Sequence, residues 1–326
     1  MALLLKHEEI VGLLKVDEVI QTIRSGLVEQ GQGQVQLPPR TTIDSTSGHG
    51  WLRLMPAILN GSGLMGYKAM HSTPGVGVRY MVALYDLKTG ELLAEVDADW
   101  LTIQRTAAMA AIATDELAKN DIQLVGVIGS SEQAGSLLIA VANVRRFSTV
   151  KVFSPNRDHR FRFAERLSDE LKLSVIPVDT PQQAVSESDL VLNAYRAGTT
   201  PVLLGKWLQP GAHVAAISAV RPEAREMDEE VWRRSSVIVV DDREHVLTSG
   251  DGRCAVANCS VRPDDMIELW ELVCRKRPGR RNENEISLFK SVGTALQDLS
   301  LATAIYRRAR EKGIGVEIGE FPHVRP

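Results

Sequence analysis

The chain lacks long apolar runs and has few cysteines. No uninterrupted apolar stretch among its 326 residues approaches the ~20 residues that a membrane-spanning helix needs, and the apolar start at residues 2–5 is too short for a secretory leader. The three cysteines, Cys254, Cys259 and Cys274, are an odd number without metal-ligand spacing. We therefore expect reduced thiols, a cytoplasmic location and no association with a membrane.

An excess of basic charge is also missing. Lysine and arginine total 38 against 41 aspartate and glutamate, so the formal net charge is −3 at pH 7. A protein whose main task is to bind nucleic acid usually carries a basic surface. We therefore expect a small-molecule partner and no nucleic acid. The length and the 44% hydrophobic content favour two domains.

The most informative motif that is present lies at residues 123–144. The apolar run Leu124–Ile128 meets the turn Gly129-Ser-Ser-Glu-Gln-Ala134, and a mostly apolar, helix-length segment follows. A strand, a tight turn and a helix N-terminus together form the geometry that binds the pyrophosphate of a dinucleotide. Ser131 stands where the second glycine of the usual pattern lies, so an ordinary turn in a parallel sheet is the alternative at this point.

Short apolar runs alternate with helical segments from about residue 121 to residue 289. The candidate strands are 124–128, 150–153, 174–178, 190–194, 213–217 and 237–240, and helical composition is found at 160–172, 181–186 and 223–234. This alternation predicts an α/β fold with a Rossmann-type doubly wound parallel sheet.

The segments on either side of this sheet predict a second α/β domain. Helices are expected at 7–14 and 16–29, followed by antiparallel strands with a hairpin turn at 86–90. Asp99 is a candidate cap for a helix over 100–119, and 291–312 has the pattern of a long helix that returns to this domain. We therefore expect residues 1–118, completed by 294–326, to form one domain, and residues 119–293 to form the inserted sheet domain.

Six segments, in order along the chain, resemble the ornithine cyclodeaminase/mu-crystallin family. They are Leu54-Met-Pro56, Gly66-Tyr-Lys68, Leu101-Thr-Ile-Gln-Arg-Thr-Ala-Ala108, Ile128-Gly-Ser-Ser-Glu-Gln-Ala134, Leu208-Gln-Pro-Gly-Ala-His213, and Phe289-Lys-Ser-Val-Gly293 with Gln297-Asp298. The resemblance implies a dinucleotide-binding domain inserted into a domain for substrate binding and dimerisation. It also implies NAD(P)(H) as cofactor, a substrate cleft between the two domains, and a homodimer.

The resemblance assigns candidate substrate residues. Arg40, Lys68 and Arg105 match family positions that line the substrate cleft. Guanidinium groups hold a carboxylate in a defined orientation, and a lysine partly removed from water has a lowered pKa that suits proton transfer. Lys68 is therefore the catalytic candidate, and Arg40, Arg53, Lys68 and Arg105 are the candidates for binding a small amino or imino acid. The alternatives for these side chains are surface ion pairs and a solvated strand lysine.

Candidate cofactor residues lie after the candidate strands, and one, Thr106, lies in the helix expected over 100–119. They are Thr106, Gly129, Ser130, Ser131, Glu132, Gln133, Ala134, Ser154, Asn156, Arg157, Ala194, Ser218, Val220, Ser291 and Gly293. No metal site is expected, because the histidines are not spaced as ligands. After the second strand, Ser154, Asn156 and Arg157 stand where NAD-specific sites place an acid for the ribose hydroxyls, which favours NADP over NAD.

Two departures from the family pattern shape the functional prediction. Cyclodeaminases of the family carry an aspartate two residues before a proline, where this chain has Val220, and ornithine-using members carry an acid at the place of Arg53. An arginine there would repel a substrate ammonium and attract a second carboxylate, and Arg79 is a candidate partner in this.

These residues predict an NAD(P)-dependent imino-acid reductase or amino-acid dehydrogenase that acts on a small, by hypothesis dicarboxylic, substrate. The alternatives are an ammonia lyase of the ornithine cyclodeaminase type and a mu-crystallin-like NADP-dependent ligand-binding protein.

Overall fold

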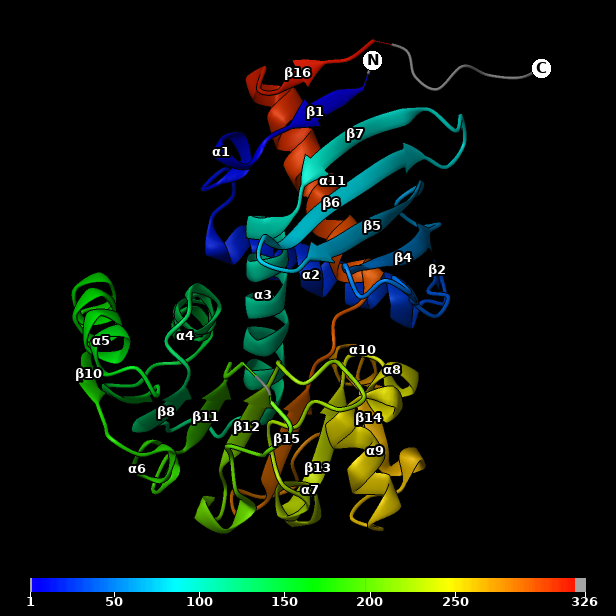
Figure 1. The fold of residues 1–326 in the computed structure, drawn as a ribbon. Coiled ribbons are helices and arrows are strands. Elements are labelled where there is room, and N and C mark those ends of the chain that lie inside the picture. The colour runs from blue at the N-terminus through cyan, green and yellow to red at the C-terminus, as the bar shows by residue number, and fades with distance from the viewer. Residues whose placement is uncertain (1, 197, 320–326) are drawn as a thin grey trace. The chain divides into compact units, whose positions relative to one another are not determined.

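The computed structural model describes residues 2–196 and 198–319, and these residues divide into two compact units. Unit 1 extends to Arg105 and resumes at Thr294, and unit 2 is Thr106–Gly293. Helix α3 (Asp99–Leu117) carries the chain from unit 1 into unit 2. Each unit contains a β-sheet with helices packed against it (Figure 1).

The sheet of unit 1 has the strand order β16-β1-β7-β6-β5-β4-β2, with β3 paired to β4. Its strands are β1 (Leu3–Leu5), β2 (Val35–Gln36), β3 (Thr41–Asp44), β4 (Trp51–Leu59), β5 (Leu64–Thr73), β6 (Gly77–Asp86), β7 (Leu92–Asp97) and β16 (Val316–Glu317). Strands β2 to β7 pair antiparallel, as predicted, and β1 pairs parallel with β7. The predicted hairpin turn is confirmed, because Asp86 Oδ1 accepts the N–H groups of Lys88 and Thr89.

Two helices cover one face of this sheet. They are α2 (Val16–Gly31) and α11 (Ala295–Lys312), and a short helix α1 (His7–Ile10) precedes them (Figure 1). Helix α2 buries Val19, Ile23 and Leu27, whose spacing places them on one side of the helix. Helix α11 packs against α2 and strands β4 to β7, so the predicted return of the last helix to the first domain is confirmed.

The sheet of unit 2 is parallel, with the strand order β10-β9-β8-β11-β12-β15-β13-β14. Its strands are β8 (Leu124–Ile128), β9 (Thr149–Phe153), β10 (Ser174–Pro177), β11 (Leu190–Asn193), β12 (His213–Ala216), β13 (Ser235–Val240), β14 (Met266–Glu268) and β15 (Ile286–Lys290). The chain winds from β8 to β10 in one direction and then from β11 in the other, so the predicted doubly wound Rossmann-type sheet is confirmed.

Helices connect these strands. They are α4 (Glu132–Val144), α5 (Arg157–Leu171), α6 (Pro181–Val185), α7 (Glu229–Arg234), α8 (Arg243–Thr248), α9 (Gly250–Ala257) and α10 (Leu269–Val273), with single 3-10 turns at Gly205–Trp207 and Pro263–Asp265. The buried apolar faces of β8, β11 and β12 form the centre of the core of this unit.

Strand β15 was missing from the predicted strands, although it lies inside the sheet between β12 and β13 (Figure 1). Its residues Ile286–Lys290 are all buried. Ser287 and Lys290 interrupt its apolar pattern, and each is satisfied by a partner from elsewhere in unit 2, His213 for the serine and Glu226 for the lysine. Buried polar groups with distant partners are invisible to an apolar-run criterion.

Several predicted helix bounds were wrong. The helix expected at 223–234 begins only at Glu229, with Asp228 as its cap. The helix expected at 7–14 ends at Ile10, because Gly12 has a left-handed φ of +71°. Helix α3 includes Asp99, whose N–H is accepted by Asp97 Oδ1, so Asp99 is not its cap. The helix expected from residue 291 begins at Ala295.

Candidate active site

The parallel strands of unit 2 bring the predicted cofactor loops to one edge of the sheet. Strands β8, β9, β11, β12 and β15 run in the same direction, so the loops that follow them lie at the same edge. These loops and the first turns of α4 and α5 contain the predicted cofactor residues other than Thr106, which lies in α3 and is 6% exposed. Ligands of open parallel sheets bind outside this edge, where the winding reverses, and here that point lies between β8 and β11.

The turn after β8 has the geometry of a phosphate cradle. Gly129 has a φ of +117°, and a Cβ on it would lie 2.8 Å from the carbonyl oxygen of Ala194, so a side chain is excluded. Ser131 caps α4, because its hydroxyl accepts the N–H of Ala134 at 3.3 Å. The serine at the second glycine position therefore starts the helix whose positive end lies at this edge, and the turn fits a dinucleotide pyrophosphate.

The loop after β9 presents polar side chains without an acid. Asn156 Oδ1 accepts the N–H of His159 and caps α5, so this oxygen is already engaged. The Arg157 guanidinium lies 4.5 Å from the centre of the Phe161 ring, and both side chains are exposed. Ser154 is buried, and its carbonyl accepts a hydrogen bond from Arg160. The exposed cation of this loop is therefore Arg157.

Two buried carboxylates hold the loops after β12 and β15. Glu226 accepts the backbone N–H groups of Ser218 and Ala219. Asp241 accepts the N–H groups of Val292 and Gly293 and the hydroxyl of Ser291. The hydroxyl of Ser291, a predicted cofactor residue, is thus turned toward Asp241.

In unit 1, strand register places Lys68 and Arg53 on the same face of the sheet. On paired strands β4 and β5, Lys68 lies opposite Met55 and Met70 lies opposite Arg53. Residues two apart in a strand share a face, so Lys68 and Arg53 lie on the same face of the sheet. Arg79 pairs with His71, so it lies on the opposite face. The hypothesis that Arg79 assists Arg53 is therefore wrong, because successive side chains of a strand alternate between faces.

Lys68 is a fully buried cation. Its Nζ donates to Thr102 Oγ1 at 2.6 Å and to Asp298 Oδ1 at 3.0 Å, and it lies 5.0 Å from the centre of the Tyr80 ring. The pKa of Lys68 is lowered to about 8, mainly by burial. The charge of Asp298 opposes this effect, and the charges of Arg105 and Arg40 add to it. An ammonium with this pKa can give up and regain a proton near neutral pH.

Arg105 shares the carboxylate of Asp298 with Lys68. Its Nε donates to Asp298 Oδ1 at 3.0 Å and its Nη1 donates to Gln297 Oε1 at 2.6 Å. Its remaining donors, on Nη1 and Nη2, lie outside these two bonds. Among the described residues Asp298 Oδ2 accepts no hydrogen bond, although it is buried. A buried oxygen without a donor is an acceptor site for a ligand N–H or for water.

The sequence resemblance assigned Lys68 and Arg105 to one cleft, and the structure bonds both to Asp298. It assigned no role to Thr102, Gln297 or Asp298. The pair Gln297-Asp298 stood in a family-like segment, and its acid near the start of a long helix was the available signal. The other two substrate candidates lie on or before the neighbouring strands. Arg40 affects the pKa of Lys68, and Arg53 donates through Nε to Thr42 Oγ1 at 2.8 Å.

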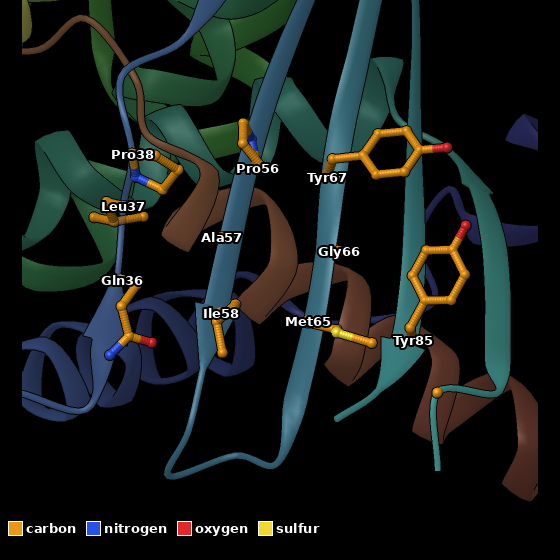
Figure 2. A pocket seen from close by; sticks show the side chains of 11 residues that line it. Gln36, Leu37, Pro38, Pro56, Ala57, Ile58, Met65, Gly66, Tyr67 and Tyr85 are labelled. Atoms are coloured by element: carbon orange, nitrogen blue, oxygen red, sulfur yellow. The ribbon is translucent and has the colours of Figure 1, made fainter. Parts of the chain in front are cut away.

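A pocket of about 840 Å³ lies on the other face of the unit 1 sheet. Figure 2 shows Pro56, Ile58, Met65, Tyr67 and Tyr85 beside it on β4, β5 and β6. None of the predicted site residues lines it, and Tyr67 alternates with Lys68 along β5. In the described part of the chain, no group of three or more His, Cys, Asp or Glu side chains is placed to hold a metal ion. No helix in that part is long and apolar enough to span a bilayer.

A family model, ornithine cyclodeaminase/mu-crystallin family, matches residues 1–313. The chain belongs to this family. The resemblance inferred from six short segments is therefore confirmed over almost the whole chain.

Solved structures of similar proteins agree with this membership. Thermococcus litoralis Δ1-pyrroline-2-carboxylate reductase, in complex with NADH and L-proline, is 33% identical with a TM-score of 0.92, covering 97% of this chain and 100% of that one. The iminosuccinate reductase of Paracoccus denitrificans, in complex with NAD+, is 26% identical with a TM-score of 0.91, covering 97% of this chain and 99% of that one.

Alanine dehydrogenase is a further relative. The Archaeoglobus fulgidus enzyme is 30% identical over 325 residues, which are 98% of each chain. A solved archaeal alanine dehydrogenase, a dimer with bound NAD, is 29% identical with a TM-score of 0.92, covering 98% of this chain and 99% of that one. The activities named for these family members, imine reduction and amino-acid dehydrogenation, are those predicted from the sequence.

Proposed function

We propose that this member of the family is an NAD(P)-dependent imino-acid reductase or amino-acid dehydrogenase. The observation that carries the proposal is the buried Lys68 ammonium, paired with Asp298 and beside Arg105. A proton donor with a pKa of about 8 next to a guanidinium is what reduction of an α-imino acid requires. The named activities of similar proteins support the same reaction class.

In this proposal unit 1 binds the substrate; it ends at Arg105, earlier than the residue 118 expected from the sequence, and resumes at Thr294. The substrate carboxylate is held by Arg105, Arg40 and Arg53, because guanidinium donors grip a carboxylate in a fixed orientation. The free oxygen of Asp298 accepts an N–H of the substrate nitrogen. Arg53 also suits a second carboxylate, and a similar protein is named for iminosuccinate, a dicarboxylate. We therefore propose a small dicarboxylic imino acid as the preferred substrate.

Residues 119–293 bind the dinucleotide in this proposal. The pyrophosphate lies against the turn from Gly129 to Ala134, and the nicotinamide half lies toward the loops that contain Ala194, Ser218 and Val220. Similar proteins were solved with NADH or NAD+, so a nicotinamide dinucleotide is supported. We propose NADP as the preferred form, because the loop after β9 offers Arg157 and no acid.

The chemistry divides between cofactor and protein. When bound, the nicotinamide supplies a hydride to the imine carbon. Lys68 transfers a proton from Nζ to the imine nitrogen, which leaves a neutral amine on Lys68 that solvent reprotonates. In the reverse direction the neutral Lys68 accepts the proton from the substrate amine. Asp298 keeps Nζ in place and holds Arg105 beside it.

The lyase alternative lacks a proton-transfer group at its usual place. Val220 occupies the position of the cyclodeaminase aspartate and cannot exchange a proton. The decisive experiment mixes purified protein and NADH or NADPH with a panel of 2-oxo acids plus ammonia or methylamine, and NAD(P)+ with amino acids. Net cofactor oxidation or reduction supports the proposal. Ammonia release without net cofactor change would instead indicate a lyase, and saturable ligand binding without turnover would indicate a binding protein.

We also propose that the protein is a homodimer. The open face of the unit 1 sheet carries the pocket lined by Ile58, Met65, Tyr67 and Tyr85, and Leu52 and Leu54 on β4 are 40% and 36% exposed (Figure 2). Contiguous apolar surface of this kind is typical of a protein contact. An archaeal alanine dehydrogenase of the same fold was solved as a dimer. A second copy of this chain is therefore the proposed partner of this face.

A further inference from the structure

A cluster of charged side chains lies inside unit 2, apart from the turn after β8. Glu226, Asp251 and Lys290 are each 0% exposed. Lys290 Nζ donates to Glu226 Oε1 and lies 3.9 Å from Asp251 Oδ2. Burying three charges is costly unless they are paired with one another, as they are in this cluster. The reaction proposed above uses none of them.

The carboxylate of the cluster that matters here is that of Glu226, which bonds to the loop after β12. The carboxylate of Glu226 accepts the N–H groups of Ser218, at 3.0 and 3.2 Å, and of Ala219, at 3.1 Å. These residues follow the carboxyl end of β12. Charge-assisted bonds from backbone N–H groups to a carboxylate are stronger than bonds between neutral groups. The position of this loop therefore depends on where the Glu226 carboxylate sits.

Glu226 is itself fixed from two directions. Asp251 accepts its backbone N–H at 3.2 and 3.3 Å, and Lys290, the last residue of β15, fixes its side chain. Asp251 also pairs with Arg225, whose Nε lies 3.2 Å from Oδ1. Glu226 lies in the segment before α7, which begins at Glu229 with Asp228 as its cap. The arrangement transmits the position of rigid β15 to the loop after β12.

We propose that Glu226 is a positioning residue, which with Lys290 and Asp251 holds the Ser218–Val220 loop in place to bind the nicotinamide half of the dinucleotide. This inference rests on the proposed function, since Ser218 and Val220 are proposed cofactor contacts. Its consequence is selective. Loss of the Glu226 carboxylate weakens binding at the nicotinamide end and leaves the adenosine end, at the turn after β8, unchanged.

The test compares two ligands of one site. ADP-ribose lacks the nicotinamide, so the ratio of the Kd for NADH to the Kd for ADP-ribose reports on the nicotinamide end alone. The main variant is Glu226→Gln combined with Lys290→Met, which removes both charges with little change of volume and leaves no unpaired cation beside the amide. We expect at least about a tenfold rise in the Kd for NADH and less than about a twofold change for ADP-ribose, since bonds to charged groups contribute on this scale.

Asp189→Asn is the matched control. Asp189 also accepts two backbone N–H groups, those of Gln123 and Leu124, and pairs with Lys119 at 2.6 Å, but it lies at the amino ends of the strands. Asp189→Asn should lower the melting temperature and leave the ratio of the two Kd values unchanged. In steady-state assays the double variant should raise the KM for NADH and leave the KM for the imino acid within about twofold.

Other outcomes decide against one proposal or the other. A double variant that binds NADH as the wild type does would overturn the positioning role. Equal weakening of NADH and ADP-ribose would also overturn it, because general damage to the unit affects both ends. Wild-type protein that binds neither NADH nor NADPH would instead overturn the proposed function.

Discussion

Asp298 Oδ1 lies 3.0 Å from Lys68 Nζ, and both side chains are 0% exposed. The pair joins the middle of β5 to the first turns of α11, so two segments of unit 1 that are far apart in the sequence meet at the proposed proton donor. Asp298 favours the charged form of Lys68, whereas burial and the neighbouring guanidinium groups disfavour it. This balance makes the protonation of Lys68 sensitive to a single substitution.

Lys68→Met should abolish most of the activity. It removes the proposed proton donor while Asp298 keeps Arg105 as a partner, so the fold should persist. We expect kcat for imine reduction to fall by about 10²- to 10⁴-fold, the usual contribution of a general acid. Stopped-flow or steady-state NAD(P)H absorbance measures this. Lys88→Met, at an exposed hairpin position, is the control, and turnover within a few-fold of wild type in Lys68→Met would remove Lys68 from the mechanism.

Asp298→Asn should move the pH profile to lower pH. Reduction needs protonated Lys68, so its rate should fall as pH rises through about 8 in the wild type. The reverse oxidation needs neutral Lys68 and should rise through the same pH. Without the carboxylate that raises the pKa of Lys68, both midpoints move down. Thr102→Val removes an uncharged acceptor from Nζ and should move them less. An unchanged midpoint in Asp298→Asn would show that Lys68 does not set the profile.

Arg157→Met should change cofactor preference. If its guanidinium contacts a 2′-phosphate, the KM for NADPH rises about tenfold or more, because a bond between two charged groups is lost, and the KM for NADH stays the same. Arg162→Met, on the exposed side of the same helix, is the control. A wild-type protein that strongly prefers NADH would contradict the proposed role of Arg157.

Arg53→Met should reduce discrimination between substrates. We expect wild-type kcat/KM with ammonia to be at least about tenfold higher for a four-carbon dicarboxylic 2-oxo acid than for pyruvate, because a second carboxylate finds a guanidinium partner. The variant should lose that difference. Arg79→Met is a matched control, since Arg79 lies on the opposite face of the same sheet. Equal wild-type activity on both acids argues against a dicarboxylic substrate.

Met65→Lys combined with Ile58→Lys should dissociate the proposed dimer. Both side chains line the open pocket on the uncovered face of the sheet, where a buried charge without a partner is costly (Figure 2). Light scattering coupled to size exclusion should give the mass of two chains for wild type and one for the variant. Lys88→Met again serves as a surface control. A wild-type protein of 35.8 kDa in solution would refute the dimer.

Local patterns were sufficient to predict the parallel sheet and the strand, turn and helix at residues 124–144. The run from Leu124 to Ala134 contains a strand, a turn and a helix cap within a few residues of one another, and each has its own signal. The family-like segments likewise assigned Lys68 and Arg105 to one cleft, and both bond to Asp298 in the structure. These features depend on short-range sequence or on motifs that stand in register.

The missed features depend on contacts between distant residues. Asp298 meets Lys68 across 230 positions, so its function follows from the fold and not from its neighbours in the chain. In the sequence Lys290 looks like an ordinary charged residue at the end of a strand. Its bond to Glu226 becomes visible only in the folded structure. The face on which Arg79 lies follows from the register of β5 with β6, which the sequence does not state.

The position of β15 has a consequence for synthesis of the protein. Ile286–Lys290 is the last strand of unit 2 to be made, yet it is the strand that joins β12 to β13. Until residue 290 has left the ribosome, β13 and β14 cannot pair with β15, and the apolar edge of β13 stays uncovered. Chains that stall before this point are therefore expected to need chaperone protection, and unit 2 should complete its fold only late in translation.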